Sequence, residues 1–274
     1  MRSITFAAAA VLGVSGAAIA ASSGQGPALP RINVAMDGTS ITVGGTLQSG
    51  AVNVVSTTTR EKEGDPLLFR LNPGVTPEHL LAFANSRAAQ DADNLAPYGA
   101  IVLNAQAPRG VSAVQTVLQP GQYVAIDTAN LNSSKQPHTT FTITPAAQPA
   151  TLPTPGATIS AIEFGFRGAT RLHTGELVRF VNRGHLLHMV IFVKLAPGAS
   201  PGNVITLLRQ GKGNQANRFF TGGFTAAAPL SSGASQQMTL TASPGTYIVA
   251  CFMETQDGRD HTQLGMLRVI HIVR

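Results

Sequence analysis

The sequence is poor in cysteine, in charged residues and in aromatic residues, and these shortages limit the kinds of protein it can form. A single cysteine, Cys251, cannot form an internal disulfide, so the chain is not a disulfide-stapled scaffold. Only 12% of the residues are charged and 5% are aromatic, whereas glycine (28) and proline (17) are plentiful. This composition favours many short strands joined by turns over long helices.

Runs of basic residues and the usual enzyme motifs are also missing. The chain carries 19 basic and 13 acidic residues, for a formal charge of +6, but it has no Lys/Arg run. We therefore expect a mildly basic surface, and we do not expect a nucleic-acid partner. The sequence contains no Gly-x-Ser-x-Gly elbow, no Walker loop and no His-Glu-x-x-His helix, so it predicts none of the enzymes that depend on them.

The N-terminus has the pattern of a secretory signal peptide. Met1-Arg2 is a short positive region, an apolar stretch runs from Ser3 to Ile19, and Ala18-Ile19-Ala20 precedes a polar segment. The length would also allow a membrane anchor, but alanine and glycine make the stretch only weakly hydrophobic. We therefore predict a signal peptide over residues 1–21, export to the periplasm or the medium, and no membrane span after cleavage.

The mature chain contains a long internal repeat. Leu71-Asn72-Pro73-Gly74 is matched by Leu195-Ala196-Pro197-Gly198, and Pro120-Gly121-Gln122-Tyr123 by Pro244-Gly245-Thr246-Tyr247, both with an offset of 124. Unrelated turns would not keep one offset, so two similar domains are expected. We predict domains at residues 28–145 and 156–274, joined by a Pro/Ala/Thr-rich linker at residues 146–155.

Each half reads as all-β with one short helical insert. Thr76-Pro77 and Ser200-Pro201 have the pattern of a capped helix start. Six or seven short strands in each half predict two tandem Greek-key β-sandwiches. The expected helices are Pro77–Ala89 and Pro201–Arg209, and the expected strands are Ile32–Met36, Ser40–Val43, Ala51–Ser56, Leu67–Leu71, Val114–Leu118, Tyr123–Asp127, Thr139–Thr144, Thr158–Phe164, Leu177–Asn182, Met189–Leu195, Gln236–Thr241, Thr246–Phe252 and Leu267–Val273.

The last thirty residues gather the candidate chemistry. A strand that ends near Cys251 is followed by a polar loop with His261 and then by Met266. A thiolate, an imidazole and a thioether suit a soft one-electron metal such as copper, and His188 can supply a second imidazole. For each of these residues packing or solvation is an alternative role, and His185 is a rival ligand to His188.

The second half resembles the cupredoxin family. Gly175–Asn182 followed by His188 is similar to the family's strand ending in Asn with a ligand histidine a few residues later. Pro244-Gly245-Thr246-Tyr247 before Cys251 resembles its cysteine strand, and His261 with Met266 resembles its second histidine and axial methionine. The resemblance implies one copper held by His188, Cys251, His261 and Met266, with Asn182 supporting the site by hydrogen bonds.

The spacing of the site departs from the family pattern. Nine residues separate Cys251 from His261, more than the family usually has. The inserted segment could bulge as a hairpin without moving His261, or it could place His261 too far away. The first half matches the fold without the ligands, since the offset of 124 places Asp127 at Cys251 and Gly64 at His188.

Two functions therefore stand as hypotheses. The leading one is an exported cupredoxin-like protein that binds one copper in its second domain for electron transfer or copper handling, with a redox protein as partner. The alternative is a metal-free secreted β-sandwich protein that serves as an interaction or structural module. Multicopper oxidase or copper nitrite reductase activity is not expected, because the chain has seven histidines but no His-x-His pair.

Overall fold

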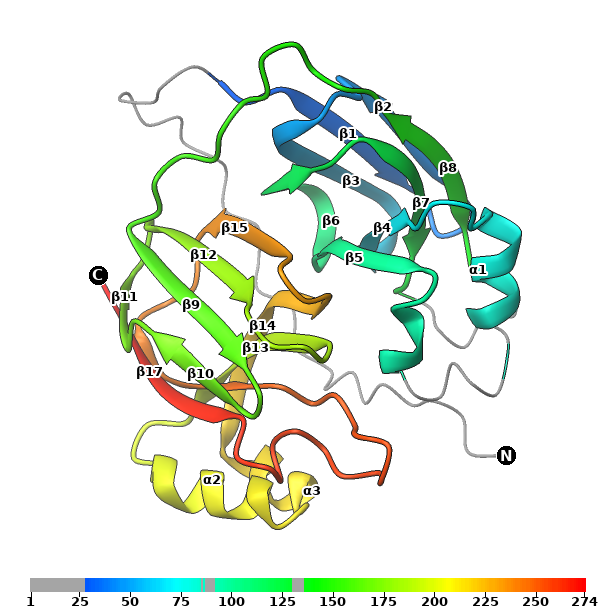
Figure 1. Cartoon of the computed structure of the whole chain (residues 1–274). Helices are drawn as coiled ribbons and strands as arrows, with labels where there is room; N and C mark the ends of the chain where they lie inside the picture. Colours follow the sequence, from blue (N-terminus) through cyan, green and yellow to red (C-terminus); the bar gives the residue numbers. More distant parts are fainter. Residues whose placement is uncertain (1–27, 85, 87–91, 130–135) are drawn as a thin grey trace.

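The computed structural model of the chain describes residues 28–84, 86, 92–129 and 136–274 (Figure 1). The predicted signal peptide lies outside the described residues, as does part of the segment 85–91. Within the described part, no helix is long and apolar enough to cross a membrane.

One large sheet runs through both halves of the chain (Figure 1). Its two halves meet where β15 pairs antiparallel with β6 through Gln236↔Thr116 and Gln237↔Gln115. In spatial order its eight strands are β10 (Gly165–Gly168), β9 (Ala157–Ile162), β12 (Leu177–Asn182), β15 (Ser235–Thr239), β6 (Ala107–Leu118), β3 (Gly50–Gly64), β1 (Arg31–Met36) and β2 (Ile41–Gly45).

Each half adds a second sheet of its own. The first half contributes four strands in the order β5 (Gly99–Asn104), β4 (Pro66–Leu71), β7 (Gly121–Asp127) and β8 (His138–Ile143). The second half contributes five, in the order β11 (Arg171–His173), β17 (Leu267–Val273), β16 (Gly245–Ala250), β13 (His188–Leu195) and β14 (Phe220–Leu230). Alternating apolar residues face the space between sheets, as in β1, whose burial alternates along its length.

The helices are short and lie in connections between strands. Ser200 caps α2, where its Oγ accepts a hydrogen bond from the Asn203 amide at 3.4 Å, and Pro201 opens the helix as predicted. Thr76 accepts from the His79 amide at the start of α1 in the same way, at 3.4 Å. The helical segments are α1 (Pro77–Ala84), α2 (Pro201–Arg209), α3 (Gly213–Ala216) and the 3₁₀ turns η2 (Ala92–Leu95) and η3 (Asn217–Phe219).

The repeat seen in the sequence has a structural counterpart at two buried tyrosines. The hydroxyl of Tyr123 donates to the Gln119 carbonyl at 2.8 Å, and that of Tyr247 donates to the Ser243 carbonyl at the same distance. Both rings are at most 2% exposed. Each tyrosine thus ties the start of its strand to the residue four positions earlier, at positions related by the offset of 124.

The predicted all-β class with few helices is confirmed, but several elements differ from expectation. The strand predicted over Thr158–Phe164 ends at Ile162, because residues 163 and 164 turn into β10. The helix predicted over Pro77–Ala89 is described over Pro77–Ala84, Ser86 is a bend, and residues 85 and 87–89 lie outside the described part of the chain. Four strands were not predicted: β5, β10, β11 and β14. β14 is rich in glycine and alanine and forms by pairing along β13 at the sheet edge, where Pro229 is tolerated.

The contact between the halves is buried and hydrogen-bonded. Gln236 is 0% exposed, its Oε1 accepts from the Asn104 amide at 3.2 Å, and its Nε2 donates to the Ala226 carbonyl at 2.6 Å. One hydrophobic cluster contains residues of both halves, including Phe69 and Phe180. The two halves therefore share core and sheet rather than meeting at an exposed surface.

We predict that Gln236→Leu destabilises the whole chain. The substitution leaves a buried amide and a buried carbonyl without partners, at a cost of about 2–4 kcal/mol in the free energy of unfolding. Urea unfolding followed by circular dichroism measures it, with the exposed Gln122→Leu as the matched control. A Gln236→Leu midpoint equal to that of the control would contradict the role assigned to this side chain.

Candidate metal centre

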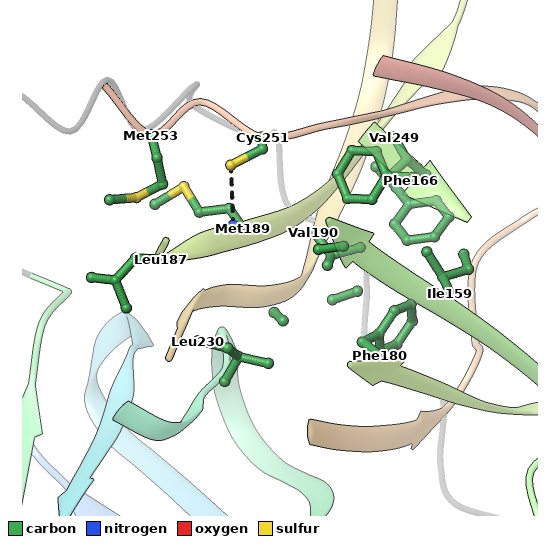
Figure 2. Packing of buried hydrophobic residues seen from close by; sticks show 14 of the residues in the cluster. Ile159, Phe166, Phe180, Leu187, Met189, Val190, Leu230, Val249, Cys251 and Met253 are labelled. Carbon is green, nitrogen blue, oxygen red and sulfur yellow. Dashed lines mark hydrogen bonds between the residues drawn. The ribbon is translucent and has the colours of Figure 1, made fainter. Parts of the chain in front are cut away.

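Cys251 is placed by the pairing of two central strands. It directly follows β16, which runs antiparallel to β13 with Ala250 opposite Ile191. The end of β16 therefore lies beside the beginning of β13. The Cys251 side chain is 0% exposed, and its Sγ accepts a hydrogen bond from the Met189 amide at 3.2 Å (Figure 2). The thiol thus points at the first residues of β13.

His188 is the first residue of β13 and is 1% exposed. The loop before it, residues 183–187, is tied to Asn182. The Nδ2 of Asn182 donates to the carbonyls of Leu186 and Leu230, both at 2.7 Å, and its Oδ1 accepts from the Gly184 amide at 2.9 Å. Asn182 thus contacts backbone groups of the loop and of Leu230 and not the donor atoms, and its supporting role stays a prediction.

A residue of the first half reaches the same loop. The Leu187 amide, next to His188, donates to Oδ1 of Asp93 in η2 at 2.9 Å. The half without the candidate ligands therefore contacts the backbone that carries one of them. No motif in the sequence pointed to Asp93.

His261 returns to the site through a hairpin. The amide of His261 donates to the Met253 carbonyl at 2.7 Å, and Glu254 forms a bridge with Asp260. The intervening residues project as a turn, in which the Thr255 amide donates to the Arg259 carbonyl at 2.9 Å. Of the two alternatives for the segment inserted between Cys251 and His261, the structure therefore has the bulged hairpin. Although His261 follows a polar loop, it is 1% exposed.

The three donor atoms converge. The Nδ1 atoms of His188 and His261 are 3.2 Å apart, and Sγ of Cys251 is 3.3 Å from Nδ1 of His261 and 3.9 Å from Nδ1 of His188. Metal–nitrogen bonds near 2.0 Å and metal–sulfur bonds near 2.3 Å place neighbouring donors roughly 3.3–3.8 Å apart. The separations therefore fit three ligands of one ion. A group of three or more His, Cys, Asp or Glu side chains that could hold a metal ion occurs at one place in the described part of the chain, and it consists of His188, Cys251 and His261.

The remaining predicted residues lie as follows. Met266 is 0% exposed, and its backbone carbonyl accepts from the Cys251 amide at 3.3 Å, so its backbone runs beside the cysteine. Its place as an axial ligand stays a prediction. The rival His185 is exposed and does not belong to the converging group. Met189 and Met253 lie near Cys251 and belong to the same hydrophobic cluster (Figure 2).

Burial sets the protonation of the metal-free donors. It raises the pKa of the Cys251 thiol to about 12, against weaker opposing hydrogen bonds from the backbone. Burial also lowers the pKa of His188, and burial together with the neighbouring His188 lowers the pKa of His261 to about 4. Both imidazoles are therefore neutral at pH 7, the form that binds metals, while the thiol must lose its proton to do so.

The turn between β9 and β10 covers the site from outside. Oε1 of Glu163 accepts from the amides of His185 and Leu186, the latter at 3.0 Å, and lies 3.4 Å from Nε2 of His188. The ring of Phe164 meets that of His261 edge-on, with centroids 5.0 Å apart. Sequence reasoning placed both residues in a strand and missed this contact.

The position equivalent to Cys251 in the first half holds carboxyl groups. Asp127 ends β7, is 3% exposed, and accepts from the Asp65 amide through Oδ1 at 3.0 Å. Oδ1 of Asp65 and Oδ2 of Asp127 are buried without a hydrogen-bond partner. Burial, with the charges of Glu63 and Asp127, raises the pKa of Asp65 from 3.8 to about 7. Two carboxyl groups therefore stand where the second half has its thiol.

Comparisons with known proteins return blue copper proteins and copper enzymes. No protein-family model and no curated protein matches the chain. Auracyanin B is 21% identical over 45% of this chain and 93% of its own, with a TM-score of 0.29. Auracyanin A, a blue copper protein from Chloroflexus aurantiacus, is 23% identical over 42% of this chain and 98% of its own, with a TM-score of 0.25. Copper nitrite reductase from Nitrosomonas europaea is 10% identical over 89% and 94%, with a TM-score of 0.25. At this similarity the matches assign no residue role or activity to this chain.

We predict that Cys251 is protected from thiol reagents in the folded, metal-free protein. Because the side chain is 0% exposed, a disulfide reagent such as DTNB cannot reach it without an opening of the chain. Native protein at pH 7.5 should react far more slowly than protein in guanidinium chloride, where one thiol per chain should react at once. Equally fast labelling in both conditions would place the thiol at the surface.

A second prediction concerns Asp65 and pH. Because folding raises its pKa from 3.8 to about 7, the folded state holds this proton more tightly. The carboxyl therefore lowers the free energy of unfolding as the pH rises through that window. Asp65→Asn should stabilise the chain most at pH 8, with the gain shrinking towards pH 4. Urea titrations across this range measure it, and a pH-independent difference would contradict the assignment.

Proposed function

We propose that this chain is an exported cupredoxin-like protein that binds one copper ion in its C-terminal half for electron transfer or copper handling. The observation that carries the proposal is the convergence of His188 Nδ1, His261 Nδ1 and Cys251 Sγ within 4.8 Å of one another, in a buried position. Met266 is the proposed weak axial ligand. Asn182 is proposed to hold the loop that positions His188.

The chemistry of the donor set favours copper. Two imidazoles and a thiolate in a three-ligand arrangement, with a thioether nearby, are typical of blue copper electron-transfer sites, whereas structural zinc sites use four strong ligands. Bound copper would supply a one-electron change between its two oxidation states. The chain's own part is to hold the three donors near one another and to exclude water, since His188, Cys251 and His261 are each at most 1% exposed.

The domain organisation belongs to the same proposal. We infer two tandem Greek-key sandwiches at residues 28–145 and 156–274, joined by the linker at 146–155 and preceded by a signal peptide at 1–21. The paired tyrosines and the separate second sheet of each half support this division. The first domain is proposed to act as a structural partner of the second, and the expected partner of the whole is a redox protein.

We further propose that the chain is a carrier and not an oxidase or a reductase. Catalysis at additional copper centres requires several more imidazoles, usually as closely spaced pairs, and the sequence has no His-x-His. This leaves one copper per chain as the expected stoichiometry.

Copper titration of the reduced, metal-free protein tests the proposal. We expect an intense visible thiolate-to-copper absorption that saturates at one equivalent. Cys251→Ser and His261→Ala should abolish it, whereas His271→Ala, at an exposed position on β17, should leave it unchanged. A colourless sample that binds no copper would reject the proposal. A metal-free interaction module would then be favoured if Cys251→Ala cost only about 1–2 kcal/mol in packing.

A further inference from the structure

A carboxylate stands behind one of the proposed ligands. Nδ1 of His188 faces the point where the donors converge, and on the opposite side of the ring Nε2 lies 3.4 Å from Oε1 of Glu163. Nε2 of His188 is a buried nitrogen without a hydrogen-bond partner, and the Glu163 carboxylate is the charged group beside it. The carboxylate is therefore the nearby acceptor for a proton on Nε2.

Glu163 is held in this place by the loop before His188. Its Oε1 accepts from the amides of His185 and Leu186, so the carboxylate has a defined position although its side chain is 32% exposed. Hydrogen bonds from two backbone amides to one oxygen favour the ionised form of the carboxylate.

Gly184 leaves room for this arrangement. A Cβ at position 184 would collide with Oε1 of Glu163 and would lie 2.7 Å from Nε2 of His188. The loop backbone at Gly184 thus lies so close to the Glu163 carboxylate and the His188 ring that only glycine fits there. This glycine is required for close approach and not for a positive φ, which it does not have.

We propose that Glu163 is a positioning residue for the metal centre: it keeps the proton of His188 on Nε2, turns Nδ1 toward the metal, and with its negative charge favours the cupric over the cuprous state. The inference rests on the proposed copper function. The physical reason is that a carboxylate hydrogen-bonded to the outer nitrogen of a ligand imidazole fixes its tautomer and raises its basicity. A nearby negative charge also stabilises the more highly charged ion more strongly.

Glu163→Gln tests the charge while keeping an oxygen that can accept from the two loop amides. We expect cupric affinity to fall about tenfold or more, cuprous affinity to fall less, and the reduction potential to rise. The matched control is Glu176→Gln, which also removes one carboxylate. Glu176 lies just before the first residue of β12, whereas Asn182, next to the loop of the site, is the last residue of that strand. Competition titrations and a redox titration measure these quantities. Identical affinities and potentials in the two variants would overturn the proposal.

A second measurement separates this inference from the proposed function. Nitrogen-15 NMR of the metal-free protein reports the tautomer of His188, expected as Nε2–H in the wild type and shifted toward Nδ1–H in Glu163→Ala, which removes the accepting oxygen together with the charge. If the wild type binds no copper, the copper function fails, while a tautomer shift would still support the positioning role and an unchanged tautomer would overturn it. If Glu163→Ala does not fold, Glu163→Asp, which keeps the charge and the accepting oxygens, replaces it. A wild-type tautomer in this variant supports the role, and a lost preference for Nε2–H contradicts it.

Discussion

The antiparallel pairing of β13 with β16 is the constraint on which the site depends. It sets Ala250 opposite Ile191 and so brings the residue after β16 beside the first residues of β13. The contact from the Met189 amide to Sγ of Cys251 is the direct result. Because side chains alternate along a strand, a slip of one residue would turn the cysteine to the other face of the sheet. Strand register therefore determines the meeting of Cys251 and His188, although 62 residues separate them in the chain.

The second histidine depends on a different constraint, a backbone hydrogen bond. The His261 amide donates a hydrogen bond to the Met253 carbonyl, and residues 254–260 form a hairpin between these two positions. The length of that loop has little influence on where His261 lies, because the hydrogen bond fixes its two ends next to each other. The entropic cost of closing a loop also rises only slowly as the loop becomes longer. This explains how a nine-residue spacing is compatible with a buried imidazole 3.3 Å from the cysteine sulfur.

Much of the arrangement could be predicted from the sequence, because it depends on residue types with narrow local requirements. The repeated Pro-Gly-x-Tyr pattern identified the duplication, and both tyrosines make the same hydrogen bond. The set of His188, Cys251 and His261 followed from ligand chemistry, but their distances did not.

Glu163 and Phe164 could not be predicted, since their role comes from a hairpin turn that lies against two histidines from elsewhere in the chain. β14 escaped detection for the same reason: its strand conformation comes from its partner and not from its glycine-rich sequence.

The loop before His188 shows why the site needs more than its ligands. The four consecutive amides of residues 184–187 all donate to side chains, and these side chains come from three separate places in the chain. Asn182 accepts from the first, Glu163 from the second and third, and Asp93 from the last. Asp93 belongs to the half without ligands, which is joined to the other half through the shared sheet. A loop fixed at every amide leaves His188 little freedom, so the imidazole is already in place before any metal binds and little conformational entropy remains to be lost. The first half thus contributes to the candidate centre by restricting the backbone that carries His188.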